Sequence, residues 1–415
     1  MSLERAPRIL ILGLNYAPEI VGIAVYTTGL AETAKARGWD IHVVAGKPYY
    51  PNWRTFAGFE PGLSLRTEEN GVELTRVAFY VPAAPSGAKR ILHHLSFALM
   101  GLPFTLSRAR SFRPDLVMTV APSLIGAPVA WLAARIFGGK TWLHIQDFEV
   151  EASMSTGLVS NQGQVARLAL GFERWVLGRF DKVSAISPAM CRKCVEKGVP
   201  ADRVFEFRNW AEIDQIVPLA GRSPYRDEWN LGDRHVALYS GNIANKQGIE
   251  IVLAAARGLR ERRDIVFVVC GQGPNRARLE ELASDLDNII FRDLQPKERL
   301  GDLLGLASVH LMPQLAGAAD LVLPSKLTNM LASGRPVVAT ADPGTGLAEE
   351  VEGCGIVTPP GDTAAFTAAI TELIDDEPRS RALGIAARAR AEERWRKDSI
   401  IDGFLARARE LIGRT

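Results

Sequence analysis

The chain has 415 residues, of which 47% are hydrophobic and 23% charged, and its formal net charge is +2. This length is too great for a single core and suits two or three domains, and the composition excludes a disordered chain. A net charge so close to zero does not favour nucleic acid as a partner.

Strands and helices alternate along the first half of the chain. A buried strand at residues 8–13 is followed by a helix at 23–37, which ends at Gly38. The further strands are expected at 41–45, 116–120, 141–145 and 182–186. Short β-branched runs separated by helical stretches predict a parallel sheet that is covered on both faces.

The alternation stops at residues 205–232 and then starts again. The second set has strands at 236–241, 265–271, 289–291, 309–312 and 337–340, and a helix at 248–263. We predict two doubly wound α/β domains, 1–207 and 208–393, facing a cleft where ligands bind beyond the carboxyl ends of the strands. A last helix lies within 394–415, and its periodicity does not decide whether it returns to the first domain.

Cysteine content and the chain ends predict a cytoplasmic location. Four cysteines are too few for a disulfide framework and indicate a reducing compartment. The N-terminus runs into a strand with no signal peptide, and no apolar run reaches the about 20 residues of a membrane span. Cys191 and Cys194 form a Cys-x-x-Cys pair on a predicted helix. With no second ligand pair nearby, two ordinary helix positions are favoured over a redox or zinc site.

The segment from Pro324 to Pro336 is the most informative part of the chain. Ser325 is typical of a helix N-cap, and Gly334 is typical of the residue after a last turn. The N–H groups of the first turn then suit an anion. Lys326 adds a positive charge where the helix dipole disfavours it, so we expect a negative partner such as a phosphate. The alternative is a surface crossover with an incidental lysine.

Three further strand-to-helix loops suit a phosphate or a sugar. The first, at 15–24, carries Gly22, where the backbone can approach a diphosphate closely, although a plain turn fits equally. The second, at 241–248, has a lysine, Lys246, before a glycine, as in a phosphate cradle, with a solvated lysine as the alternative. The third, with Gly271 and Gly273, is expected to leave room for a ligand.

The first half offers other chemistry. His144 and Asp147 lie at the carboxyl end of a predicted strand, where either can act as a base or position a hydroxyl group. A hydrogen-bonded histidine without a catalytic role is equally compatible. Residues 86–113 contain basic and large apolar side chains and no acid, which favours an anionic membrane surface over a core helix with a basic edge.

Taken together, these motifs resemble those of the retaining glycosyltransferases of family 4, which have the GT-B fold. The set comprises Asn15–Glu19 with Gly22, Pro48–Pro51, His144–Asp147, Ser240–Ile243, Lys246–Gly248, Gly271–Pro274 and Pro324–Pro336. It covers nearly the whole chain in the order of the family. Within the family, the sequence is similar to proposed fucosyltransferases of colanic-acid-type exopolysaccharide assembly and to amino-sugar transferases of O-antigen assembly.

The resemblance implies a nucleotide sugar in the second domain, an acceptor in the first, no metal or other cofactor, and retention of configuration. Carried over from the family, Lys246 stabilises the diphosphate and Gly22 approaches it from the other domain. Ser325 contacts phosphate through the helix start, and the backbone of Leu294 contacts the base. The donor is expected to be GDP- or UDP-linked, and the acceptor a glycan or a polyprenyl-diphosphate-linked sugar.

Three positions depart from the family pattern. The family carries two glutamates, one for the donor sugar and one for ribose, where this chain has Leu321 and Asn329. Asp320 is a candidate substitute for the first, and the Asn329 amide can still accept and donate one bond each. A family arginine is replaced by Asn242. These losses leave a non-catalytic scaffold as the main alternative and a sugar-nucleotide epimerase as a lesser one.

Overall fold

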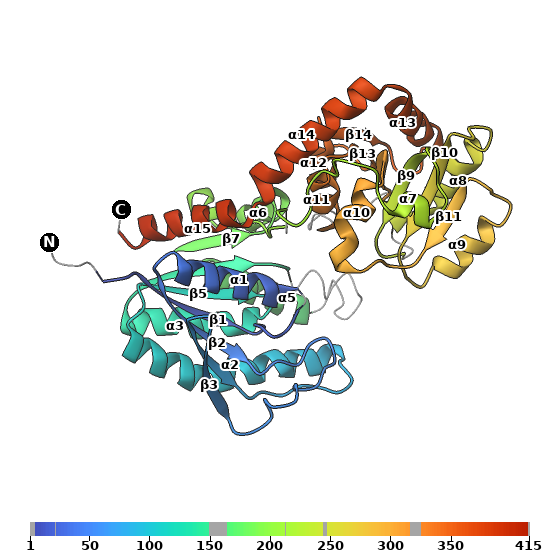
Figure 1. Ribbon diagram of the computed structural model, residues 1–415. Coiled ribbons are helices and arrows are strands. Elements are labelled where there is room, and N and C mark those ends of the chain that lie inside the picture. The colour runs from blue at the N-terminus through green and yellow to red at the C-terminus, as the bar shows by residue number, and fades with distance from the viewer. Residues whose placement is uncertain are drawn as a thin grey trace. The chain divides into compact units, whose positions relative to one another are not determined.

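The computed structural model describes residues 5–20, 22–148, 164–211, 213–243, 247–315 and 325–413. Contacts divide the chain into two compact units, residues 1–209 with 400–415 and residues 210–399. Figure 1 shows the first unit in blue to green with its C-terminal helix in red, and the second unit in yellow-green to red. The predicted domain boundary at 207/208 lies two residues before the division.

Unit 1 contains an eight-stranded sheet in the order β3-β4-β2-β1-β5-β6-β7-β8. All neighbouring strands are parallel except the antiparallel pair β3 and β4. The strands are β1 (Arg8–Gly13), β2 (Asp40–Gly46), β3 (Ser64–Glu69), β4 (Val72–Val77), β5 (Leu116–Ala121), β6 (Lys140–Ile145), β7 (Lys182–Ala185) and β8 (Val204–Glu206). Every residue of β5 is buried, as expected for a central strand with helices on both faces.

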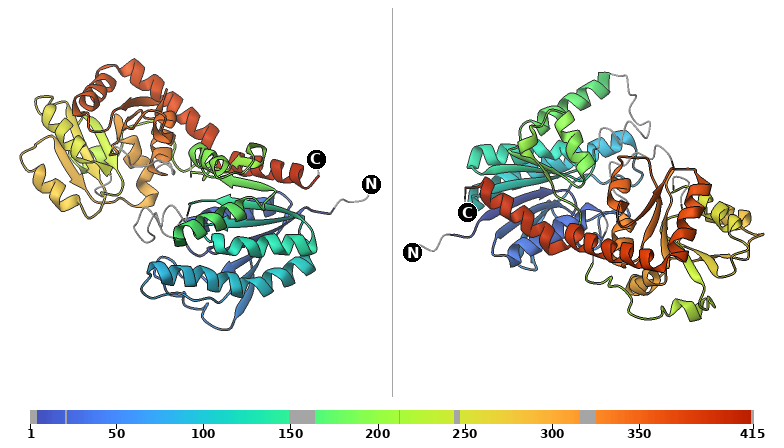
Figure 2. Two further views of the ribbon diagram at one scale, coloured as in Figure 1. Left: turned by 180° about the vertical axis from the view of Figure 1, so that it is seen from behind. Right: turned by 90° about the horizontal axis from the view of Figure 1, so that it is seen from above.

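Helices cover both faces of this sheet (Figure 2). They are α1 (Ile23–Ala36), α2 (Gly87–Phe112), α3 (Ala127–Phe137), α5 (Gln164–Leu177) and α6 (Pro188–Glu196). Because α2, α3 and α5 connect parallel strands in one direction across the sheet, right-handed crossovers place them on one face. The connection through α1 runs the other way, so α1 lies on the opposite face.

Unit 2 contains a parallel six-stranded sheet in the order β11-β10-β9-β12-β13-β14. Its strands are β9 (His235–Ser240), β10 (Ile265–Cys270), β11 (Ile289–Arg292), β12 (Val309–Met312), β13 (Val337–Thr340) and β14 (Gly355–Thr358). Its helices are α7 (Tyr225–Glu228), α8 (Glu250–Gly258), α9 (Arg276–Leu282), α10 (Leu300–Gly305), α11 (Ser325–Ala332), α12 (Gly346–Val351), α13 (Thr363–Asp375) and α14 (Glu377–Trp395). Side chains of Thr345, Asp362 and Asp376 cap α12, α13 and α14.

The C-terminal helix differs from its predicted start at Arg394. The backbone is extended at Arg396 (φ −69°, ψ 121°), which separates α14 from α15 (Lys397–Leu411). From Ile400 onward the chain belongs to unit 1. There the Phe404 ring lies 4.6 Å from that of Trp142 and 4.9 Å from that of Phe207.

Candidate functional site

Each sheet has one point where the chain order reverses, and in unit 2 this point lies between β9 and β12. Connections leave these neighbouring strands in opposite directions, so their carboxyl ends leave an opening where ligands bind in such sheets. The loop that begins at Gly241 follows β9, and α11 comes after β12. Lys326, in the first turn of α11, therefore lies at this opening.

The Lys326 side chain lies across the β9 loop and has neutral neighbours. Its Nζ is 3.2 Å from the Tyr239 hydroxyl and 3.2 Å from the Gln247 side-chain oxygen, and it lies 4.4 Å from the centre of the Tyr239 ring. Among the described residues, no carboxylate forms an ion pair with it. Burial lowers the pKa of the Lys326 ammonium to about 8. The expected negative partner is thus not supplied by the described protein groups.

Tyr239 is the residue that fixes this lysine, and the sequence motifs did not reveal it. Its hydroxyl donates to the Asn242 carbonyl oxygen at 2.6 Å and accepts from Lys326. Burial raises the pKa of the Tyr239 phenol, so it remains a neutral donor. Its position, two residues before Gly241 at the end of a buried strand, is the signal that could have identified it.

Gly271 and Gly273 are required by the neighbouring loop. A Cβ on Gly271 would lie 1.9 Å from the Gly241 carbonyl oxygen, and one on Gly273 would lie 2.2 Å from that of Ile243. Backbone bonds join the same loops, with Ile243 N donating to Gln272 O at 2.8 Å. This differs from the prediction that the two glycines leave room for a ligand, because the β9 loop fills the space on their Cβ side.

The loop after β11 is attached to the loop after β10. Asp293 accepts from Gln272 at 2.9 Å and is paired with Arg276. The exposed Leu294 follows directly, so its backbone lies beside these two loops. The carboxyl ends of β9, β10 and β11 are thereby joined into one layer.

Two further candidates lie on α11. Ser325 is its first residue, and its side chain lies outside the description. Asn329 is half-buried, one turn after Lys326, and no described group hydrogen bonds with its side-chain amide. Lys246, Asp320 and Leu321 lie outside the described residues.

In unit 1 the chain reverses between β1 and β5, and the loop after β1 is held by Glu19. One Glu19 oxygen accepts from the backbone N–H groups of Tyr49 and Tyr50, both at 2.8 Å, and the other accepts from Asn15 at 2.8 Å. Two of the sequence motifs are thus joined through one buried carboxylate. Gly22 is the N-cap of α1 with φ 54°, and a Cβ there would meet nothing within 4 Å.

His144 lies in the core of unit 1. Its ring nitrogens contact Ser184 Oγ at 2.9 Å and Gln146 Nε2 at 3.1 Å, and burial lowers the pKa of the ring to about 3. Gln146 and Asn209 exchange two amide hydrogen bonds of 2.8 Å. The catalytic role of His144 stays a prediction, and its buried ring is neutral and bonded to Ser184 and Gln146. Asp147, the other candidate, is exposed after β6.

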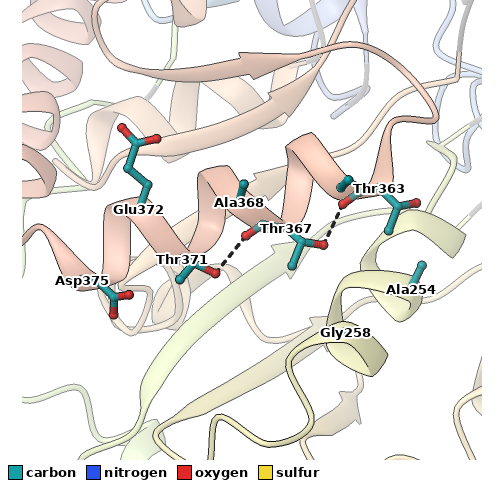
Figure 3. Close-up of a pocket in the computed structure, with 9 residues that line it drawn as sticks. Ala254, Gly258, Thr363, Thr367, Ala368, Thr371, Glu372 and Asp375 are labelled. Atoms are coloured by element: carbon teal, nitrogen blue, oxygen red, sulfur yellow. Dashed lines mark hydrogen bonds between the residues drawn. The ribbon is translucent and has the colours of Figure 1, made fainter.

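Several features lie apart from these loops. Within the described ranges, no group of three His, Cys, Asp or Glu side chains could hold a metal ion, and no helix is long and apolar enough to cross a membrane. Cys191 and Cys194 lie on α6 and form no disulfide bond. A groove between α8 and α13 is lined by threonines whose hydroxyls, at Thr367 and Thr371, bond to backbone carbonyls one turn earlier (Figure 3).

Comparison with protein families gives two adjoining matches. Residues 21–210 match the glycosyl transferase 4-like domain, and residues 234–376 match the glycosyl transferases group 1. The chain is 41% identical over 377 residues to the glycosyl transferase WcaI of Escherichia coli strain K12, whose name assigns it to colanic acid biosynthesis. This alignment covers 88% of the chain and 92% of WcaI.

More distant matches come from a sequence relative and from solved structures. A GDP-mannose-dependent mannosyltransferase of Mycolicibacterium smegmatis is 27% identical over 75% of this chain and 82% of its own. The sucrose-phosphate synthase of Thermosynechococcus elongatus superposes with a TM-score of 0.70 at 18% identity, covering 98% of this chain and 99% of its own. Anabaena HepE in complex with UDP superposes with a TM-score of 0.68 at 16% identity, covering 97% and 100%.

Proposed function

The chain belongs to the family 4 glycosyltransferases with the GT-B fold, and we propose that it transfers a sugar from a nucleotide sugar to a sugar acceptor with retention of configuration and without a metal. The observation that carries this proposal is the half-buried ammonium of Lys326. It lies at the switch point of unit 2 with neutral partners only. A diphosphate is the anion that this family places at such a position.

The proposed chemistry follows from the charges of the reaction. Breaking the bond between the sugar and the phosphate develops negative charge on the leaving diphosphate. Donors that are already in position lower this barrier, and the loss of one typically costs about 3–4 kcal/mol. Lys326 and the first N–H groups of α11, beginning at Ser325, are such donors. Lys246, by resemblance to the family, is another.

Lys326 also compensates for Asn242. The family has an arginine there, whereas this chain has a neutral amide. The Lys326 Cδ atom lies only 3.2 Å from the Cβ position of Gly241, so the lysine stem covers the residue beside Asn242. We infer that a cation from α11 replaces the missing cation of the β9 loop. Asn329 is then left to hold the ribose through a neutral amide.

The names of the relatives support a proposal for the donor and the pathway. WcaI is named for colanic acid biosynthesis, the mycobacterial relative uses GDP-mannose, and HepE binds UDP. We propose that the donor is a GDP- or UDP-linked sugar, with a fucose-type sugar as one candidate. We also propose a role in exopolysaccharide assembly. The proposed acceptor is a glycan or a polyprenyl-diphosphate-linked sugar.

In unit 1 we assign the acceptor side of the reaction to Asp147. Its exposed carboxylate at the end of β6 can position a hydroxyl group, unlike the enclosed His144. Replacing Asp147 with alanine is expected to reduce transfer while leaving donor binding intact. Equal losses of both would make Asp147 a structural residue.

A lipid-linked acceptor requires access to a membrane, and residues 86–113 support this. In α2, Ile91, Leu92, Leu95 and Leu99 are all exposed and form one stripe about 100° wide at helical spacing. Lys89 and Arg90 precede the stripe, whereas Arg108 is paired with Glu73 at 3.3 Å. We propose that this stripe, with Lys89 and Arg90, contacts the inner face of the cytoplasmic membrane.

A thermal-shift titration with GDP, UDP and ADP tests the donor site directly. The matching diphosphate should stabilise the protein by about 2.7 kcal/mol at 100 times its Kd, and the others less. Incubation with candidate nucleotide sugars should then release the diphosphate slowly without an acceptor. If a diphosphate stabilises the protein but no nucleotide sugar releases diphosphate, the non-catalytic scaffold would be favoured. The replacement of a family glutamate by Asn329 is the observation behind that alternative. The absence of any stabilisation would contradict the proposed donor site.

A further inference from the structure

A second basic site lies in unit 1 at the amino-terminal edge of the sheet, before β5 and β6. The loop after β1 lies at the opposite, carboxyl-terminal edge. A pocket at the amino-terminal edge is lined by five basic side chains and two carboxylates, together with Trp131 and the backbone around Gly138. The charged residues are Arg5, Arg113, Arg135, Lys140, Arg179, Asp115 and Asp181. Nothing in the proposed transfer uses this pocket.

Local backbone geometry forms the pocket. The chain leaves α2 at Arg113 in the left-handed region (φ 49°) and leaves α3 through Gly138 and Gly139 (φ 86° and 104°). A Cβ on Gly139 would lie 2.7 Å from the Pro114 carbonyl oxygen, so the two turns pack closely. This packing brings Lys140 to the same pocket as Arg113.

The carboxylates of the pocket are already engaged. Asp115 accepts from the Arg5 side chain at 2.7 Å and from the Arg8 backbone at 3.0 Å. Asp181 accepts from the backbone and hydroxyl of Thr141 at 2.8 and 2.7 Å. In contrast, four exposed cations have no ion pair with any described residue, namely Arg113, Arg135, Lys140 and Arg179. Five cations against two carboxylates leave the pocket with a charge of +3.

The pocket is bordered by an exposed apolar surface. Arg179 lies over the Trp131 and Trp175 rings at 5.6 and 5.3 Å, and the Trp175 ring stacks with that of Phe172 at 6.1 Å. Further exposed apolar side chains on α3 and α5 extend this surface, namely Leu132, Ile136 and Leu168. Contiguous apolar surface of this kind on a water-soluble domain indicates an interaction site.

We propose that this pocket binds the phosphate of an anionic phospholipid while the α3/α5 surface lies in the interface of the bilayer. Unpaired arginines and lysines attract anionic headgroups, and exposed tryptophan, phenylalanine and leucine favour the boundary between headgroups and acyl chains. A free phosphate ion would use the cations alone and leave the apolar surface in water. Because α2, α3 and α5 share one face of the sheet, the α2 stripe can contact the same bilayer.

The test compares two triple variants by co-sedimentation with vesicles of phosphatidylglycerol and phosphatidylcholine. Arg135→Gln/Lys140→Gln/Arg179→Gln should weaken binding by about fivefold for each charge removed. The control Arg66→Gln/Arg260→Gln/Lys297→Gln removes the same charge from exposed positions outside this face and should bind normally. Leu168→Ser/Phe172→Ser removes apolar side chains and should also weaken binding. This weakening should be seen both with the mixed vesicles and with vesicles of phosphatidylcholine alone. Unchanged binding of the pocket variant would overturn the proposal.

Two further arms separate the alternatives. Inorganic phosphate should bind weakly and compete poorly with vesicles, and tight binding of phosphate without vesicle binding would overturn the lipid assignment. A change of molecular mass in the pocket variant, measured by light scattering, would instead assign the surface to a second copy of the chain. Diphosphate release should be unaffected by the pocket variant. If the wild-type protein released no diphosphate, this would count against the proposed transfer and not against the lipid-binding pocket.

Discussion

The buried polar groups at the switch points of the two sheets differ in how fully other protein groups satisfy them. In unit 1, both oxygens of the buried Glu19 are used by protein N–H groups, so the loop after β1 is internally satisfied. In unit 2, the Lys326 ammonium is half-enclosed by a phenol, an amide and an aromatic ring. Hydrogen bonds hold the Glu19 carboxyl group in its loop although burial raises its pKa, whereas the Lys326 charge has no negative partner among the described residues and prepares the site for an anion.

The largest expected effect is the loss of turnover in Lys326→Met. Removing a positioned cation from the leaving diphosphate should lower the rate about 10²- to 10³-fold. The measurement is the initial rate of diphosphate release with donor and acceptor present, in parallel with Lys246→Ala. If Lys326→Met kept the wild-type turnover, Lys326 would be a structural lysine, and the proposed contrast between the two switch points would be wrong.

The same variant should gain stability. The pKa of Lys326 is about 8 in the folded protein against an ordinary 10.5, so below pH 8 its charge is carried at a cost in the folded state. This cost disappears as the pH rises from 8 to 10.5. Below pH 8, Lys326→Met should therefore unfold at a higher denaturant concentration than the wild type, and the difference should shrink at high pH.

Glu19→Ala should have the opposite effect on stability. It leaves the N–H groups of the buried Tyr49 and the exposed Tyr50 without their acceptor, which costs about 1–3 kcal/mol for a buried group and less for an exposed one. The free energy of unfolding, measured in urea, should fall by about 2–4 kcal/mol. Glu68→Ala, at an exposed position on β3, is the matched control and should change little. An unaltered midpoint for Glu19→Ala would show that the loop is held by other contacts.

The pH dependence of diphosphate affinity sharpens the comparison further. A bound diphosphate favours the charged form of Lys326, so affinity should fall as the pH rises through about 8. Between pH 7 and pH 9 the loss should be about tenfold, because only about a tenth of the lysines stay protonated at the higher pH. Isothermal titration of Lys326→Met should give a flat profile over this range. A flat profile in the wild type would exclude Lys326 as the titrating cation.

The smallest expected effect is that of Asn329→Ala. If the amide holds the ribose by one neutral hydrogen bond, its removal should raise the KM for the donor about fivefold with little change in kcat. Asn329→Asp, which restores a carboxylate, tests the same contact in the other direction. An unchanged KM in both variants would mean that the ribose is held elsewhere.

Sequence and structure agree on the elements and differ on the groups around the site. The sequence predicts that Gly271 and Gly273 leave room for a ligand, whereas in the structure the space on their Cβ side is filled by the β9 loop, 30 residues earlier at Gly241. His144 follows a pattern that places polar residues at a strand end, yet β7 and Phe207 enclose it. Periodicity reports which residues are buried and not which distant group covers them.

The sequence by itself determined the two βα domains, the order of their loops and the family, because these depend on local periodicity and on motifs that are contiguous in the chain. Only the tertiary structure decided that Lys326 meets Tyr239 and Gln247, that Glu19 holds the loop at Tyr49, and that Arg179 joins a pocket with Lys140. These partners come from different strands and helices. Their meeting depends on strand order and loop packing, which short-range patterns do not encode.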